Sequence, residues 1–120
     1  MIAGQLLYGL LGPLVDNQIY PMVVPDSAIK KTPYIVYQVI SAQPQNTLSG
    51  TTGHEWVRVQ IDIYHKSYDA AVQLSHDVVS AIDSNVQLSI YDGTQQLYEH
   101  DEQLFRQSID YEFWQTTPVT

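Results

Sequence analysis

The sequence predicts an α+β fold with a mixed, mostly antiparallel sheet of about four to five strands. Two helices should pack on one face of the sheet, and a long β-hairpin loop should connect two strands. The first indication is residues 57–63, where apolar β-branched residues alternate with Arg58, Gln60 and Asp62. The alternation returns over residues 105–113. Because successive strand side chains point to opposite faces, each stretch has one core face and one polar face.

The third indication is an apolar stripe at helical spacing after Ser67, formed by Ala71, Leu74, Val78 and Ile82. Ser67 is a plausible N-cap, and the opposite side of the segment is polar. We expect the main amphipathic helix to run from about Ser67 to Ser84.

The remaining elements follow from local patterns. A stripe of leucines predicts a short helix over residues 2–11, which Gly12-Pro13 ends. Further strands are predicted over 33–41, 54–65, 86–90 (ending in a turn at 91–93), 97–102 (running into an acidic turn) and 105–113, with a brief extended piece over 19–21. The Ser/Thr/Gly-rich stretch from Gln43 to Gly53 contains Leu48 as its only large apolar residue, and we expect it to form the long loop.

Length and composition restrict the classes of protein. A chain of 120 residues suits one domain, residues 1–120, with one modest core. Five basic and thirteen acidic residues give a formal net charge of −8, which argues against nucleic-acid recognition and against docking on anionic lipid. The absence of cysteine excludes disulfides and thiolate chemistry. The N-terminal apolar run has no basic flank, so neither a signal peptide nor a membrane span is expected.

No motif for catalysis, cofactor binding or metal binding stands out. The histidines lack the spacing of metal ligands, and His100-Asp101-Glu102 is better explained as a solvated acidic turn. Asp62 and Asp110 lie on the polar faces of two strands and could form a general acid and base pair. Arg58 and Arg106 occupy the same faces, however, so cross-strand charge pairing is the preferred interpretation.

The polar strand faces and the loop are therefore the candidate interface. It comprises Leu48, Arg58, Gln60, Asp62, Arg106, Asp110 and Glu112. Tyrosines on or beside the strands suit either packing at sheet edges or a protein interface.

Several segments resemble the tail-completion, or tail-terminator, proteins of long-tailed phages and prophages. The segments cover nearly the whole chain in the right order, with the helix after Ser67 between them. They are Ile19-Tyr20-Pro21, Pro33-Tyr34-Ile35-Val36-Tyr37-Gln38, Val59-Gln60-Ile61-Asp62-Ile63-Tyr64, Leu97-Tyr98-Glu99 and residues 105–114, which end in Trp114.

The resemblance implies a subunit of a homo-oligomeric ring, expected to be a hexamer, that caps the completed tail tube and provides the head–tail joining surface. Its partners would be further copies, the tail tube protein and the head–tail connector protein, without an enzymatic activity or a cofactor. DNA would pass through the lumen without sequence-specific binding, and no membrane contact is expected. The protein would reside in the virion, at the head–tail junction, after synthesis in the host bacterial cytoplasm.

Three alternatives remain open at this point. Neck and head-closure connector proteins share the size and the ring architecture. A small carboxylate-based or metal-dependent hydrolase would use Asp62, Asp110 and His100 in a concave pocket. A monomeric accessory domain would not self-associate.

Overall fold

The structure is a computed structural model, and it describes residues 3–21, 33–47, 50–86, 89–100 and 103–116. The described strands form one sheet in the order β1-β2-β3-β5-β4. β1 runs parallel to β2, and the other neighbours are antiparallel. The predicted fold class is confirmed. The elements are α1 (Ala3–Leu11), the 3-10 helix η1 (Gly12–Val15), β1 (Ile19–Pro21), β2 (Tyr34–Thr47), β3 (Gly50–His65), α2 (Tyr68–Asn85), β4 (Ser89–Glu99) and β5 (Leu104–Thr116).

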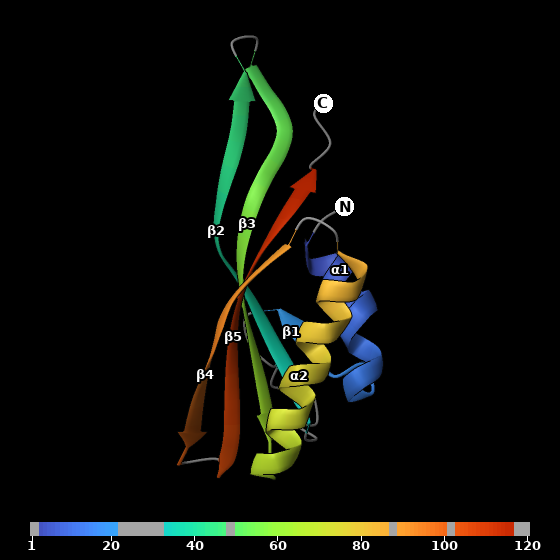
Figure 1. Cartoon of the computed structure of the whole chain (residues 1–120), viewed down its shortest axis with the longest axis vertical. Coiled ribbons are helices and arrows are strands. Elements are labelled where there is room, and N and C mark those ends of the chain that lie inside the picture. Colours follow the sequence, from blue (N-terminus) through green and yellow to red (C-terminus); the bar gives the residue numbers. More distant parts are fainter. Residues whose placement is uncertain (1–2, 22–32, 48–49, 87–88, 101–102, 117–120) are drawn as a thin grey trace.

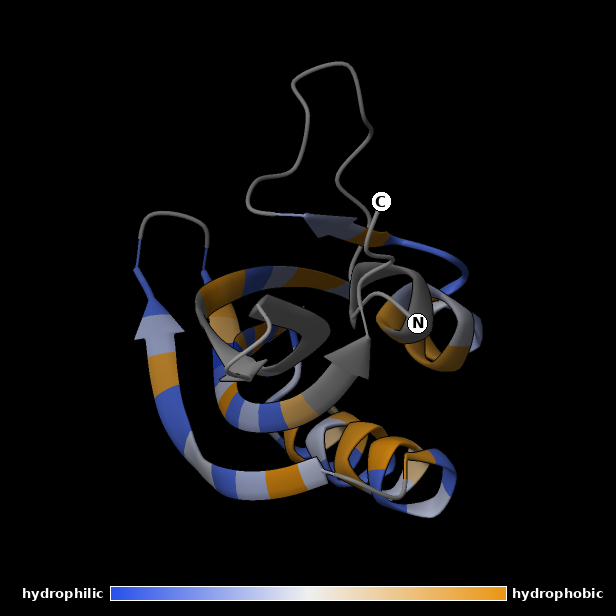
Figure 2. Cartoon of the chain, turned by 90° about the horizontal axis from the view of Figure 1, so that it is seen from above, coloured by the Kyte–Doolittle hydropathy of each residue, from blue (hydrophilic) through white to orange (hydrophobic). Residues whose placement is uncertain are grey.

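The helices lie together on one side of the sheet (Figure 1). Hydrophobic and hydrophilic bands alternate along the strands, as Figure 2 shows, so only one face of the sheet contributes to the core. The alternation predicted for the central strands is confirmed, since the odd-numbered side chains over residues 57–63 and 107–113 are buried. The core consists of Leu7, Leu11, Val15, Ile19, Ile35, Val57, Val59, Ile61, Ile63, Leu74, Val78, Ile82, Ile109, Tyr111 and Phe113.

Both helices match their predicted extents to within one or two residues. All four residues of the predicted α2 stripe are buried. The Ser67 hydroxyl accepts a hydrogen bond from the Ala70 amide at 3.4 Å, as an N-cap should. α1 ends at Leu11 as predicted, and η1 follows. A Cβ on Gly12 would lie 2.7 Å from Oδ1 of Asn17, so a larger residue here would require the Asn17 side chain to move.

The predicted loop over 43–53 is wrong in its extent, because the strands continue through most of it. Pairing of β2 with β3 reaches Thr47 and Gly50, and only residues 48 and 49 between the strands lie outside the described residues. A register shift beside Pro44 lets the ladder pass a residue that cannot donate a hydrogen bond. Pairing between the two chain segments thus outweighed the weak strand propensity of this polar stretch.

The last part of the chain also differs from the prediction. Residues 91–93 do not form a turn between two strands, because β4 continues through them from Ser89 to Glu99. The register shifts between Tyr91 and Gly93, and Gly93 adopts a φ of 144°. Glycine tolerates this backbone conformation, so the extra residue forms a bulge and the strand does not end.

The molecule is elongated. Its principal extents are 52 × 29 × 24 Å and its radius of gyration is 15.3 Å. A compact domain of this length would have a radius of gyration of about 14 Å. The excess length comes from β2 and β3, which extend past the helices as a two-stranded ribbon (Figure 1).

Candidate assembly surface

The face of the sheet that points away from the helices collects the predicted interface residues. Antiparallel pairing of β3 with β5 places Arg58 opposite Glu112, Gln60 opposite Asp110 and Asp62 opposite Ser108. Residues opposite one another in a ladder share a face of the sheet. Six of the seven predicted residues therefore lie on this outer face: Arg58, Gln60, Asp62, Arg106, Asp110 and Glu112. The seventh, Leu48, lies outside the described residues.

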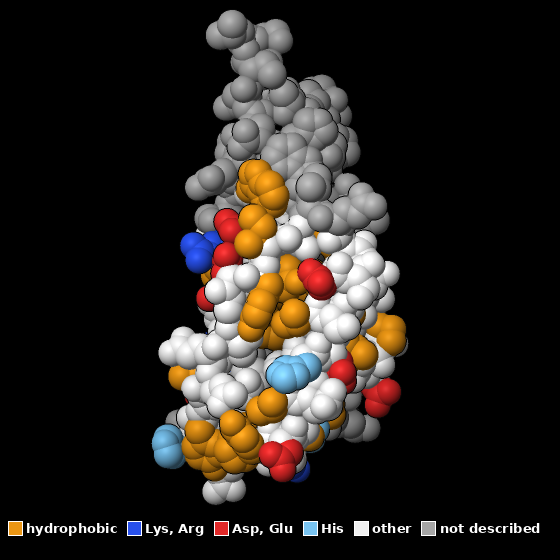
Figure 3. Space-filling view, viewed as in Figure 1, with side chains coloured by type: hydrophobic (Ala, Val, Ile, Leu, Met, Phe, Trp, Pro, Cys, Tyr) orange, Lys and Arg blue, Asp and Glu red, His pale blue; other side chains and the backbone are white. Residues whose placement is uncertain are grey.

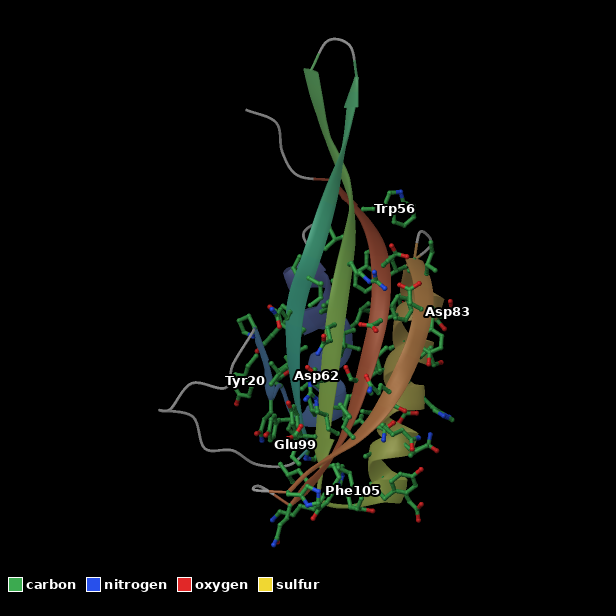
Figure 4. The ribbon with its side chains drawn as sticks, turned by 90° about the vertical axis from the view of Figure 1, so that its left-hand side faces the viewer. Tyr20, Trp56, Asp62, Asp83, Glu99 and Phe105 are labelled. Atoms are coloured by element: carbon green, nitrogen blue, oxygen red, sulfur yellow. The ribbon has the colours of Figure 1, made fainter. Side chains whose placement is uncertain are left out.

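A hydrogen-bonded network centres on Asp62, which Figure 4 labels on this face together with Glu99. The Asp62 carboxylate accepts hydrogen bonds from Nε2 of Gln60 at 3.0 and 3.2 Å and from Nε of Arg106 at 3.2 Å. Nη2 of Arg106 lies 3.1 Å from the same carboxylate. Nη1 of Arg106 donates to Glu99 at 3.0 Å, so one guanidinium joins carboxylates from β3 and β4.

The network explains how a carboxylate becomes buried on the outer face. Asp62 is only 7% exposed, and a buried charge is tolerated when it is paired and hydrogen-bonded. Burial by itself lowers the pKa of Arg106, but the hydrogen bond to Glu99 and the charge of Asp62 outweigh it, so the net pKa is raised. Arg106 therefore stays positively charged at neutral pH and balances the negative charge of Asp62.

The predicted cross-strand charge pairing is confirmed for Asp62 and Arg106. The surroundings of Asp62 and Asp110 do not favour the competing interpretation, in which these two residues form a catalytic pair. Asp110 lies opposite Gln60, and the Asp62 carboxylate is engaged by Arg106 and Gln60. A carboxylate held in this way has a structural role in fixing three strands together.

Aromatic side chains extend the network toward β2. The rings of Tyr34 and Tyr64 stack at a centroid distance of 4.8 Å, and the Arg106 guanidinium lies 5.8 Å from the centre of the Tyr64 ring. Tyr34, Tyr64 and Glu99 were not among the residues predicted for the site. The sequence did contain a signal for Tyr64, because it lies two residues after Asp62 and its side chain therefore points to the same face of the strand. The contribution of Glu99 depends on the pairing of β4 with β5, which no local pattern shows.

Apolar side chains are exposed where the ribbon leaves the helices. Val39 is 48% exposed and Ile40 is 47% exposed, although both belong to β2 near the centre of its length. Val39 lies opposite the fully buried Val59. Val39 and Val59 thus lie side by side on neighbouring strands, but the side chain of Val39 is exposed and that of Val59 is buried.

The described part of the chain contains no group of three His, Asp or Glu residues arranged to hold a metal ion. His100 packs edge-on against Tyr98, while Asp101 and Glu102 lie outside the described residues. None of the described helices is both long and apolar enough to cross a bilayer.

Comparison with known protein families shows to which family the chain belongs. The model of the family described as tail completion protein gp17 matches residues 7–116. The chain belongs to the tail completion protein gp17 family. The resemblance found in the sequence is therefore confirmed, and this tail completion protein is a structural component of a phage-like tail.

A solved structure provides an independent comparison of the fold. A chain from the virion of a native gene transfer agent particle superposes with a TM-score of 0.62 at 14% sequence identity. The superposition covers 86% of the tail completion protein and 81% of the other chain. The two chains share a fold. No curated protein sequence matches this chain.

Proposed function

We propose that this tail completion protein assembles into a ring of six copies on the end of the finished tail tube. The ring stops further polymerisation of the tube and presents the surface that receives the head–tail connector. Its role is structural, without catalysis or a cofactor. The observation that carries this proposal is the two-stranded ribbon formed by β2 and β3, together with membership of the tail completion family.

Near its end the ribbon has two strands among the described residues. The last pair that joins β3 to β5 is His54 with Thr116, and beyond it Gly50 and Thr51 pair with Thr47 and Asn46 of β2. A two-stranded hairpin without a third strand or a covering helix is at best marginally stable in water. We infer that a neighbouring subunit or the tube covers the ribbon, with Leu48 at its tip as the anchor.

The outer face supplies a second contact. Arg58 is exposed, and Gln60, Asp110 and Glu112 are half-buried around the Asp62–Arg106–Glu99 network. Because the network ties three strands together, the surrounding polar groups are held on a rigid surface. A rigid surface loses less conformational entropy when it binds. Arg58 and Glu112 carry opposite charges and are the residues we expect to pair across a subunit or tube contact.

The net charge of −8 suits a ring through which DNA passes. An acidic subunit repels the phosphate backbone, so the lumen does not retain the DNA. The same charge opposes the approach of identical subunits. Ring formation should therefore strengthen when salt or magnesium screens the repulsion.

The test is the mass and shape of the particles. Native mass spectrometry and negative-stain images of the purified protein, across a series of salt and magnesium concentrations, should show six-membered rings, either free or on added tail tubes. A protein that stays monomeric under every condition, tube ends included, contradicts the proposal. Rings that bind the connector but never the tube end would assign the protein to the neck instead.

A further inference from the structure

A cleft of about 470 Å³ opens between α2 and β4. It lies on the helix side of the sheet, away from the Asp62 network, and appears as a hollow in the space-filling view (Figure 3). Its walls mix apolar and polar side chains. They come from α2 (Val72, Ser75, His76, Val79, Ser80, Asp83), β4 (Tyr91, Thr94, Gln96) and β5 (Gln107).

One side of this cleft is a free sheet edge. β4 ends the strand order, so its second edge has no strand neighbour among the described residues. From Thr94 to Glu99 its pairing with β5 is regular, whereas the bulge lies earlier, between Tyr91 and Gly93. Residues 94–98 contain no proline, lysine or other charged residue, which are the usual protections of an edge strand. Unpaired backbone N–H and C=O groups along such an edge can accept another strand.

The edge and the cleft form one continuous feature. Thr94 and Gln96 belong to the edge strand, and their side chains line the cleft. A strand added to β4 would therefore direct alternate side chains into the cleft, toward Val72 and Val79. Backbone pairing would supply affinity, and the cleft would select the side chains.

The charges around the cleft define the chemistry of the occupant. α2 and β4 together contain Asp69, Asp77, Asp83, Asp92 and Glu99, and neither element contains a lysine or an arginine. Glu99 is paired with Arg106 on the outer face, but the four aspartates are exposed. The ring of Tyr111 packs against Tyr91 of the cleft wall, and burial and then the charge of Asp83 raise the pKa of Tyr111.

Among the described strands, a second copy of this chain offers no basic strand with a free edge. β1, β4 and the part of β2 beyond Tyr37 have a free edge, and they contain no lysine or arginine. Arg58 and Arg106 belong to β3 and β5 and have a paired strand on both sides. A segment of a different protein is therefore the better match.

We propose that the β4 edge and the α2–β4 cleft bind an extended, basic segment of a partner protein by strand addition. The segment has lysine or arginine at alternating positions whose side chains point to the cleft side, where Asp83 lies, and apolar residues at the positions between them. This site does not depend on ring formation, because one subunit contains all of it.

The probe is a fluorescein-labelled ten-residue peptide in which valine and lysine alternate, and fluorescence anisotropy measures its binding. Two control peptides accompany it, one with glutamate in place of lysine and one with N-methyl groups on alternate backbone nitrogens. We expect binding of the first peptide and at least about tenfold weaker binding of both controls, because charge and backbone pairing both contribute. Equal binding of the N-methylated peptide would overturn strand addition, and equal binding of the glutamate peptide would overturn the charge argument.

Matched variants locate the site. Ser80→Trp fills the cleft from an exposed helix position, while Ser84→Trp adds the same side chain at an exposed position that does not line it. Likewise Asp83→Lys reverses a charge in the cleft wall, and Asp77→Lys reverses one outside it. We expect about a tenfold loss of binding for Ser80→Trp and Asp83→Lys relative to the matched controls, Ser84→Trp and Asp77→Lys. Equal binding within each pair would overturn the proposal, and thermal melts verify that all four variants fold.

The same variants separate this inference from the proposed ring. If Ser80→Trp abolishes rings, the occupant of the cleft is a second copy and the inference is overturned. If rings never form but the peptide binds as described, only the ring proposal fails.

Discussion

The two halves of β3 differ in how much they contribute to the stability of the fold. Between Val57 and Ile63 every second side chain is buried under the helices. Between Gly50 and Gly53 the strand contains two glycines and two threonines, and Gly50 and Thr51 pair with β2. The first half stabilises the fold by burying apolar area, whereas the second half has no large apolar side chain to bury. The ribbon should therefore add little to the stability of the body, the part of the sheet that the helices cover.

The largest effect should come from the body. Val59→Asp places an unpaired charge at a fully buried position, and we expect a loss of several kcal/mol, enough to unfold a domain whose stability is about 5–15 kcal/mol. Gln60→Ala, the next residue but on the outer face, should leave the fold intact. Thermal melts compare the two variants. A more damaging Gln60→Ala would reverse the assignment of the two faces.

A smaller effect is expected from the outer-face network. Arg106→Ala leaves Asp62 buried without its cation, and we expect a loss of about 1–3 kcal/mol in the free energy of unfolding. The control is Arg58→Ala on the same face, where the exposed side chain should contribute less than about 0.5 kcal/mol. Urea titrations measure both values. Equal losses would mean that the network does not stabilise the body.

The smallest effect on stability should come from the ribbon. Replacing Gln45–Thr52 by a short Gly-Ser link removes backbone pairs but no residue of the core, and we expect a change below about 0.5 kcal/mol. Ring formation or tail joining should nevertheless weaken strongly, because the ribbon contact is lost. Tail-joining assays with the shortened protein measure this effect. Normal joining would show that the ribbon and Leu48 are passive.

The comparison also explains which predictions from the sequence succeeded. The alternation in β3 and β5 and the stripe in α2 are repeated over two or more turns or strand periods, so chance matches are rare. They gave the core face, the helix extents and the presence of charge pairing on the outer face correctly. The stretch from Gln43 to Gly53 has no such repeat, and its Ser/Thr/Gly composition is equally typical of a loop.

The turn predicted at Tyr91-Asp92-Gly93 failed for a related reason. A glycine after an aspartate favours a turn when the chain is considered locally. In the structure β5 continues alongside this segment, and Gly93 absorbs one extra residue as a bulge. The presence of a paired neighbour, which lies far away in the sequence, decided between the two outcomes.

Residue patterns by themselves determined the fold class, the two faces of the central strands, the position of the main helix and the acidic character of the protein. These properties follow from side-chain periodicity and composition, which are local. The tertiary structure decided the length of the ribbon, the position of β4 at the sheet edge and the junction of Arg106 with Asp62 and Glu99. Each of these depends on which distant segments pair and in what register, and pairing energy is shared between two segments, so neither segment shows it alone.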